Sequence, residues 1–371
     1  MLFFKSKKKK TCVLGLDGVP FTLLQRFVAD GTMPNAARIF SQGRLQQMKV
    51  TLPEISAVSW PSFMTGANPG THGIFGFTDL KPGSYAVRYP NYRDVKAMVL
   101  WDKLENKRKR SIVLNQPGTY PAQPMNGVLV SGFVAIDLRK AVTPLKYKSD
   151  LEKMGYRIDI NTAACRDDHA LCIKELNETL AARKKAVEFF LQAEEWDYLQ
   201  VVITGTDRLH HYLWDALDNT EHPYHAAFLD FYRQVDAFIG WLYQKFQGES
   251  GRDDAADGFF MLSDHGFTGI RQEVYLTRWL HNEGYLKFDV EQPESLEQMS
   301  AESRAFVMDP GRIMIHRSDR FPNGCVAAQD VEPLKQEMTA KLLALECSGE
   351  KVIQAVHRAE DIYSGPYVSE G

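Results

Sequence analysis

Three aspartates follow apolar runs at the points where predicted strands end. These are Asp17 after Thr11 to Leu16, Asp207 after Tyr198 to Thr204, and Asp264 after Phe259 to Leu262. The carboxyl ends of parallel strands meet at one edge of a sheet, so we expect the three carboxylates to lie close together. Carboxylates crowded in this way repel one another unless a cation lies between them. A divalent metal is the usual cation at such a position.

Two histidines have spacings that fit the same site. His211 lies one helical turn after Asp207, and His265 is adjacent to Asp264 at the end of a strand. Mixed carboxylate and imidazole ligands suit zinc, and they also suit manganese. His210 can face Asp207 as well, and spacing alone barely separates it from His211. Each aspartate taken singly is more often a helix cap than a ligand, but the combination favours a metal site.

A hydrolytic metal site also needs a nucleophile, and the segment from Pro53 to Gly66 offers two serines. Its turn residues lead into a short apolar helix that ends at a glycine. A serine at a helix N-terminus lies among unpaired amide groups, which favour an alkoxide and bind phosphate. Ser56 and Ser59 both fit this description. Ser59 lies two residues before Pro61 and can instead be a helix N-cap, so the residues alone leave the choice open.

The elements that must position these side chains alternate between apolar strands and amphipathic helices. This alternation predicts an α/β fold with a mostly parallel sheet flanked by helices. Further strands are predicted at Ser111 to Leu114 and Gly127 to Val130, and helices at Glu175 to Leu191 and Ala226 to Phe246. In the first helix, one face carries Leu176, Leu180, Val187 and Leu191, and the charged residues Arg183, Lys184, Lys185 and Glu188 are expected elsewhere.

Composition excludes several classes of protein. The 371 residues are 44% hydrophobic and 25% charged, which is typical of a globular protein, and the net charge of −3 predicts neither a nucleic-acid nor a membrane partner. No apolar run approaches the length of about 18 residues that a spanning helix needs. The five cysteines are scattered without a CxxC pair, which argues against a disulfide framework and a zinc ribbon. Met1 to Lys10 is interpreted as a solvated terminus, not a signal peptide, and we expect a cytoplasmic location.

Four motifs in order resemble the type I phosphodiesterase/nucleotide pyrophosphatase family of the alkaline phosphatase superfamily. They are Gly15 to Gly18, Ser56 to Gly66 with Asn68 to Ile74, Thr206 to His211, and Ser263 to Phe267. Each motif is weak alone, and the four in sequence are specific. The resemblance covers about residues 11 to 290 well. It continues more loosely through Asp309 to Arg312 and Ile362 to Pro366.

The resemblance implies a role for each site residue. The family places its nucleophile ten residues before the glycine that ends the motif, which here is Ser56, and many relatives carry threonine there. The family spacing Asp-x-x-x-His selects His211 over His210. One divalent cation would be held by Asp17, Ser56, Asp264 and His265, and a second by Asp207, His211 and a further histidine. Two cations are therefore expected, with zinc favoured over manganese.

The further histidine is a departure from the family pattern. The histidines after the last motif are His281, His316 and His357, and none has the family context, although His316 follows an apolar run. Either the sequence is truncated, or the second cation is held poorly, or another residue substitutes. We therefore expect a catalytic core at residues 1–267 and a cap-like insert at residues 268–371 that ends before the family's last core strand.

The resemblance implies a metal-dependent hydrolase of phosphoric esters, of the phosphodiesterase or nucleotide pyrophosphatase type, acting on a small-molecule phosphate ester. A phosphomutase or phosphonate hydrolase on the same core is the alternative among enzymes. A catalytically impaired binding protein is the alternative outside them. Asn115, Tyr120 and Arg208 can face substrate, but turn hydrogen bonding, packing and a surface ion pair explain them equally well. The oligomeric state does not follow from the residues.

Overall fold

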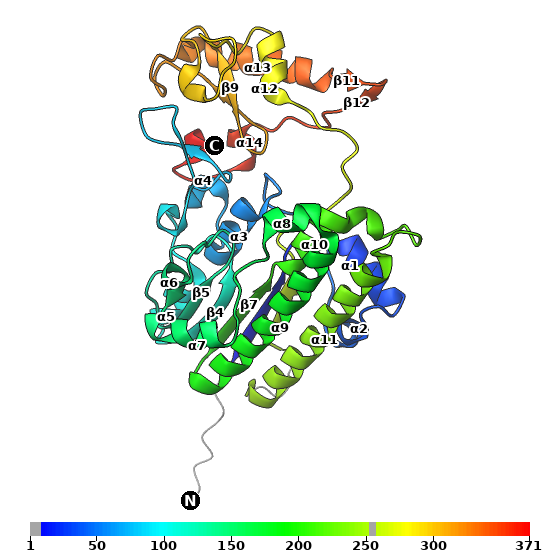
Figure 1. Ribbon diagram of the computed structural model, residues 1–371. Helices are drawn as coiled ribbons and strands as arrows, with labels where there is room; N and C mark the ends of the chain where they lie inside the picture. Colours follow the sequence, from blue (N-terminus) through cyan, green and yellow to red (C-terminus); the bar gives the residue numbers. More distant parts are fainter. Residues whose placement is uncertain (1–8, 252–256) are drawn as a thin grey trace, which may run out of the picture. The chain divides into compact units, whose positions relative to one another are not determined.

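The computed structural model describes residues 9–251 and 257–371, and Figure 1 traces the chain. The predicted solvated terminus, Met1 to Lys10, lies outside these ranges apart from its last two residues. Within the two ranges, every helix falls short of the length or the apolar character needed to cross a membrane.

The chain divides into two compact units. The first unit consists of Met1–Ala67 and Asn91–Gly269, and the second unit consists of Asn68–Pro90 and Ile270–Gly371. The predicted catalytic core and cap-like insert stay predictions, because compactness by itself assigns no role to a unit.

The first unit is built on a six-stranded sheet with the strand order β6-β5-β4-β7-β1-β8. The strands are β1 (Thr11–Leu16), β4 (Ser111–Gln116), β5 (Gly127–Ser131), β6 (Val142–Thr143), β7 (Tyr198–Ile203) and β8 (Phe259–Leu262). All neighbours are parallel except β5 and β6. The predicted mostly parallel α/β fold is therefore confirmed. Because β1 pairs with both β7 and β8, these three strands end side by side.

Alternate strand residues pack against two different layers of helices, as the two-residue period of a strand requires. On one face, Val13, Val113 and Leu129 share a core cluster with residues of α3 (Ser56–Thr65) and α5 (Leu100–Glu105). On the other face, their neighbours Leu14, Ile112 and Val128 belong to a larger cluster. That cluster draws on α1 (Phe21–Ala29), α2 (Pro34–Ser41), α9 (His169–Ala193) and α11 (His225–Glu249). The sheet is thus buried on both faces, which explains its continuous apolar runs.

The predicted helices at Glu175 to Leu191 and Ala226 to Phe246 lie within α9 and α11. One expectation about α9 is wrong, because Arg183 is buried with only 2% of its surface exposed. It lies seven residues after Leu176 and therefore on the same face, so its charge and not its position suggested exposure. The Arg183 guanidinium is satisfied by the Tyr156 hydroxyl and by two backbone carbonyls. Burial lowers the pKa of Arg183 to about 9.

Short helices complete the first unit. They are α6 (Leu138–Ala141), α7 (Lys148–Lys153), α8 (Thr162–Asp167) and α10 (Gly205–Leu213). Of these, α10 matters most for function, because it begins directly after β7 and carries Asp207 in its first turn. The carboxyl end of β7 and the N-terminus of α10 therefore place this aspartate beside the end of β1.

The second unit has its own apolar core, formed by residues such as Leu280, Tyr285, Phe306, Met314 and Met338. Its antiparallel pairs are β2 (Asp79–Leu80) with β3 (Val87–Arg88), β9 (Ala305–Met308) with β10 (Arg312–Ile315), and β11 (Glu346–Cys347) with β12 (Glu350–Lys351). Its helices include α4 (Pro69–His72), α12 (Leu276–Asn282), α13 (Val331–Leu343) and α14 (Ala359–Ile362). This unit therefore packs around small elements and not around a continuous sheet.

Candidate active site

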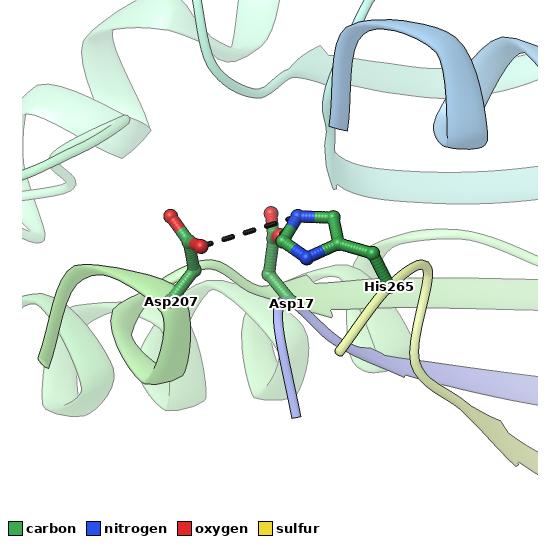
Figure 2. Close-up of side chains that lie close together, drawn as sticks. All are labelled: Asp17, Asp207 and His265. Atoms are coloured by element: carbon green, nitrogen blue, oxygen red, sulfur yellow. Dashed lines mark ion pairs between the residues drawn. The ribbon is translucent and has the colours of Figure 1, made fainter. Parts of the chain in front are cut away.

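Acidic side chains gather where β1, β7 and β8 end. Asp17 directly follows β1, Asp207 lies in the first turn of α10, and Asp264 and His265 follow β8. One ligand atom each from Asp17, Asp207 and His265 lies within 4.8 Å of the others, and Figure 2 shows the three side chains converging. The geometry thus brings together residues that are up to 248 positions apart in the sequence, from Asp17 to His265.

Asp264 is positioned by the turn that follows Asp17. Its Oδ1 accepts a hydrogen bond of 3.1 Å from the Gly18 backbone N–H. Gly18 has a φ of +65°, in the left-handed region that favours glycine, and a Cβ there would lie 2.8 Å from Asp207 Oδ1. Glycine therefore allows two acidic residues to approach the same turn.

The carboxylates are crowded and incompletely paired. Burial, Asp264 and Asp207 together raise the pKa of Asp17 well above its usual value. Burial raises the pKa of Asp264 to about 7, and Asp207 adds to the rise. Asp207 Oδ1 and Asp264 Oδ2 are buried and have no hydrogen-bond partner among the residues that the structure describes. Buried acceptors of this kind fit a bound divalent cation, which would satisfy the oxygens and offset their repulsion.

The tautomer of His265 adds to this argument. Its Nδ1 lies 2.7 Å from the Gly266 carbonyl oxygen, which can only accept, so Nδ1 carries the proton. In the neutral ring, Nε2 then presents a lone pair. This nitrogen lies 3.6 Å from Asp17 Oδ1, 3.5 Å from Asp264 Oδ2 and 4.0 Å from Asp207 Oδ1. A lone pair facing several carboxylate oxygens is the arrangement of a metal site.

Ser56 lies at the edge of this cluster, as the first residue of α3. Its hydroxyl is 3.2 Å from Asp17 Oδ1 and 3.0 Å from His265 Nε2. Ser59, by contrast, lies inside the helix and is not its N-cap, which is Ile55. The Ser59 hydroxyl is buried and, within residues 9–251 and 257–371, has no hydrogen-bond partner. Of the two serines that the sequence left open, Ser56 contacts the acidic cluster.

The adjacent histidines of α10 have different surroundings. His211 Nε2 lies 3.4 Å from Asp207 Oδ2, and its side chain is 55% exposed. His210 is buried, with Nδ1 3.0 Å from the Gly18 carbonyl and Nε2 2.8 Å from the Tyr232 hydroxyl. Burial lowers the pKa of His210 to about 3. His210 therefore packs beneath the site, and His211 faces Asp207.

Comparison with known proteins gives this cluster a family context. The profile of the family described as "Type I phosphodiesterase / nucleotide pyrophosphatase" matches residues 11–367. The chain belongs to this family. It is thereby placed among the hydrolases of phosphoric esters, and the resemblance seen in the four motifs is confirmed.

Solved structures agree with this family in fold. Phosphonoacetate hydrolase from Sinorhizobium meliloti 1021, in complex with phosphonoacetate, is 15% identical with a TM-score of 0.56. The match covers 96% of this chain and 76% of that one. Its complex with phosphonoformate gives a TM-score of 0.57 with the same identity and coverage. No curated protein matches the chain.

Some residues around the site of this phosphodiesterase-family chain were not anticipated from sequence. Trp60 of α3 donates its indole N–H to Asp17 Oδ2 over 3.3 Å. Asp159 contacts Arg208 through a close ion pair of 2.7 Å. The helical spacing of Ser56 and Trp60 is a signal that points to the first contact. Asp159 has no comparable signal, because it lies 48 positions before Asp207 and outside every motif.

Asn115 and Tyr120, which the sequence left open as substrate contacts or structural residues, make contacts typical of structural residues. Asn115 is buried with a φ of +62°, and its side-chain amide donates to Val202 O and Thr204 Oγ1, both at 3.3 Å. Tyr120 is half-buried before Pro121. These contacts agree with turn and packing roles.

The later histidines of this family member lie in the second unit. His316 is buried, with Nδ1 2.6 Å from the Ser303 carbonyl and Nε2 against the Tyr85 hydroxyl. His281 Nδ1 lies 3.2 Å from the Leu286 carbonyl. Both are engaged within their own unit, so the third histidine implied by the family resemblance stays unassigned.

Proposed function

We propose that this chain is a metal-dependent phosphodiesterase or pyrophosphatase that uses Ser56 as its nucleophile. The observation that carries the proposal is the position of the Ser56 hydroxyl, 3.2 Å from Asp17 Oδ1 and 3.0 Å from His265 Nε2. The hydroxyl therefore lies at a helix N-terminus beside a crowded group of carboxylates in which Asp207 Oδ1 and Asp264 Oδ2 have no hydrogen-bond partner among the described residues, and such clusters are typical of functional sites.

In this proposal the site holds two divalent cations, with zinc favoured and manganese the alternative. Asp17, Ser56, Asp264 and His265 would hold one, and Asp207 and His211 would hold the other. When bound, such cations lower the pKa of a hydroxyl and stabilise negative charge on phosphoryl oxygens.

The residues of the chain supply the remaining requirements. The Ser56 hydroxyl proton has an acceptor within reach, Asp17 Oδ1 at 3.2 Å. The Gly266 carbonyl fixes the ring of His265 so that Nε2 faces Ser56. Attack of the Ser56 oxygen on phosphorus breaks the bond to the leaving alcohol or phosphate and leaves the phosphoryl group, with its remaining ester substituent, bonded to Ser56. Water then hydrolyses this Ser56 ester and restores the hydroxyl.

The backbone of α3 contributes a second source of stabilisation. Ser56 is the first residue of the helix, and the first amides of a helix have no carbonyl partner within it. Charge that develops on the phosphoryl oxygens would lie near these N–H groups and the positive end of the helix dipole.

The phosphonate hydrolase alternative is compatible with the same core, and the structurally similar protein from Sinorhizobium meliloti was solved with phosphonoacetate. We therefore design the test to separate substrates. The protein is stripped with chelator, reloaded with zinc or manganese, and assayed with bis-p-nitrophenyl phosphate, p-nitrophenyl phosphate and phosphonoacetate.

The expected result is metal-dependent turnover that is fastest with the diester, together with a Ser56 adduct detected by mass spectrometry after rapid acid quenching, which from the diester carries one p-nitrophenyl phosphoryl group. Faster turnover of phosphonoacetate would support the phosphonate alternative. Absence of both bound metal and turnover would support the impaired binding protein and overturn the proposal.

A further inference from the structure

Arg208 follows Asp207 on α10, and its guanidinium is shared unequally between two carboxylates. Its side chain is only 11% exposed. Nε lies 3.0 and 3.2 Å from the two oxygens of Asp159, and Nη2 lies 2.7 Å from Asp159 Oδ2. The contact with Asp207 is a single one, from Nη1 to Oδ2 at 3.4 Å. Arg208 is therefore bound closely to Asp159 and loosely to Asp207.

This division matters because arginine and carboxylate favour a paired fork of two parallel hydrogen bonds. A fork formed by Nη1 and Nη2 on Asp207 would occupy the oxygens that the proposed function assigns to a cation. Asp159 already holds Nη2, so that edge of the guanidinium is not available to Asp207. We propose that Asp159 is a positioning residue that restrains Arg208 and so leaves the Asp207 carboxylate open to a cation. This inference rests on the proposed function.

Asp159 is itself fixed from the protein interior. The buried guanidinium of Arg183 donates to the carbonyls of Arg157 and Ile158, at 3.3 and 3.2 Å. The Ile160 N–H donates to Asp159 Oδ1 over 2.9 Å. Hydrogen bonds therefore restrain the backbone on both sides of Asp159. The buried Arg183 contributes to this restraint through its bonds to the two preceding carbonyls.

Arg208 is restrained from a second direction. Its guanidinium carbon lies 4.3 Å from the centre of the Phe133 ring, in a cation–π contact. The Phe133 ring packs against the guanidinium. The hydrogen bonds to Asp159 fix its orientation, so that only Nη1 contacts Asp207. The Asp159–Arg208 pair is electrically neutral as a unit, so the guanidinium opposes a cation at the neighbouring carboxylates less than an unpaired arginine would.

The first test is a zinc titration by calorimetry on the full chain. The variants are Asp159→Ala, the milder Asp159→Asn, Arg208→Gln and the double variant Asp159→Ala/Arg208→Gln. The matched control is Asp197→Asn, which breaks a similar ion pair with Lys109 at the start of β7, the opposite end of that strand. Circular dichroism confirms that each variant is folded.

We expect Asp159→Ala to weaken zinc binding at least tenfold and Asp159→Asn to weaken it less. In the double variant, affinity should return to within threefold of Arg208→Gln alone, because the competing cation is gone. A double variant that binds as weakly as Asp159→Ala would show a merely structural role and overturn the proposal. Wild-type affinity in Asp159→Ala would also overturn it.

The second test needs no metal. In a crystal structure of metal-free Asp159→Ala, Nη1 and Nη2 of Arg208 should both bond to Asp207. An Arg208 that keeps its place or turns to solvent would contradict the proposal. If the wild-type chain binds neither zinc nor manganese, the proposed function fails, whereas this crystal structure still decides whether Asp159 restrains Arg208.

Discussion

His265 in the first unit and His316 in the second unit have the same tautomer but opposite surroundings. In both, Nδ1 donates to a backbone carbonyl, of Gly266 in one case and Ser303 in the other. The Nε2 atom of His316 lies against the Tyr85 hydroxyl, which also contacts the Pro322 carbonyl. The Nε2 atom of His265 faces the oxygens of Asp17, Asp207 and Asp264 in addition to the Ser56 hydroxyl.

This difference separates a histidine that stabilises a fold from one that serves a site. The His316 ring is 1% exposed and its partners complete its hydrogen bonding, so it stabilises its unit. The His265 cluster combines repulsion with unsatisfied acceptors, which costs stability unless a cation is bound. Burial and residue type alone would not distinguish the two histidines.

The largest expected effect comes from the Ser56 hydroxyl, which His265 faces. Ser56→Ala should lower kcat by at least about a thousandfold, because it removes the nucleophile. Ser59→Ala is the matched control, since its buried hydroxyl has no hydrogen-bond partner in the described parts of the chain. Steady-state kinetics with bis-p-nitrophenyl phosphate measures both. Loss of activity in Ser59→Ala with retention in Ser56→Ala would reverse the assignment.

The next effect tests the two histidines directly. His265→Ala should weaken zinc binding by about a hundredfold while leaving the metal-free protein no less stable. His316→Ala should leave zinc affinity unchanged but destabilise the second unit by about 1–3 kcal/mol, because a buried ring and its hydrogen bond to the Ser303 carbonyl are lost. Calorimetry and urea unfolding measure the two quantities. Equal effects of the two variants on zinc affinity would remove the distinction.

The acidic cluster should also make the stability of the metal-free protein depend on pH. The pKa of Asp264 is raised to about 7 in the folded state, above the ordinary value of 3.8. The folded state therefore binds more protons in this window, and stability should fall as pH rises from about 4 to 7. The change is on the order of 4 kcal/mol. Asp264→Asn should flatten this slope in urea unfolding, and an unchanged slope would contradict the prediction.

The smallest expected effect concerns the exposed ligand. His211→Asn should weaken the binding of zinc by about tenfold and change the free energy of unfolding by less than about 0.5 kcal/mol, since the ring is half in solvent. His210→Asn should lower the free energy of unfolding and leave zinc affinity nearly unchanged, because it leaves the Tyr232 hydroxyl and the Gly18 carbonyl without a good hydrogen-bond partner. Zinc titration and thermal unfolding of both variants would separate these outcomes.

The sheet and the convergence of its acidic residues could be predicted from sequence, because a strand buried on both faces is a continuous apolar run. The runs before Asp17 and Asp264 coincide with β1 and β8. The choice of Ser56 over Ser59 came from the family motif and not from local physics. The roles of the site residues as nucleophile and metal ligands stay predictions.

What sequence could not supply is the set of contacts made over long distances. Arg183 was expected on a polar face because a buried arginine without a carboxylate is rare, yet three acceptors satisfy it. Asp159 belongs to no motif, and its importance depends on where α10 places Arg208. Such pairings follow from packing of whole elements, which local spacing does not encode.

The hydrogen bond from Trp60 to Asp17 has a spectroscopic consequence. Gly15 makes room for the indole, since a Cβ there would lie 2.5 Å from the Trp60 ring. The ring is fully buried, and its N–H donates to the Asp17 carboxylate, which also accepts a hydrogen bond from the Ser56 hydroxyl. A change of charge at Asp17 therefore acts on the excited-state dipole of one particular indole among the six tryptophans of the chain. The fluorescence emission of Trp60 should therefore change when a cation or a substrate binds beside Asp17.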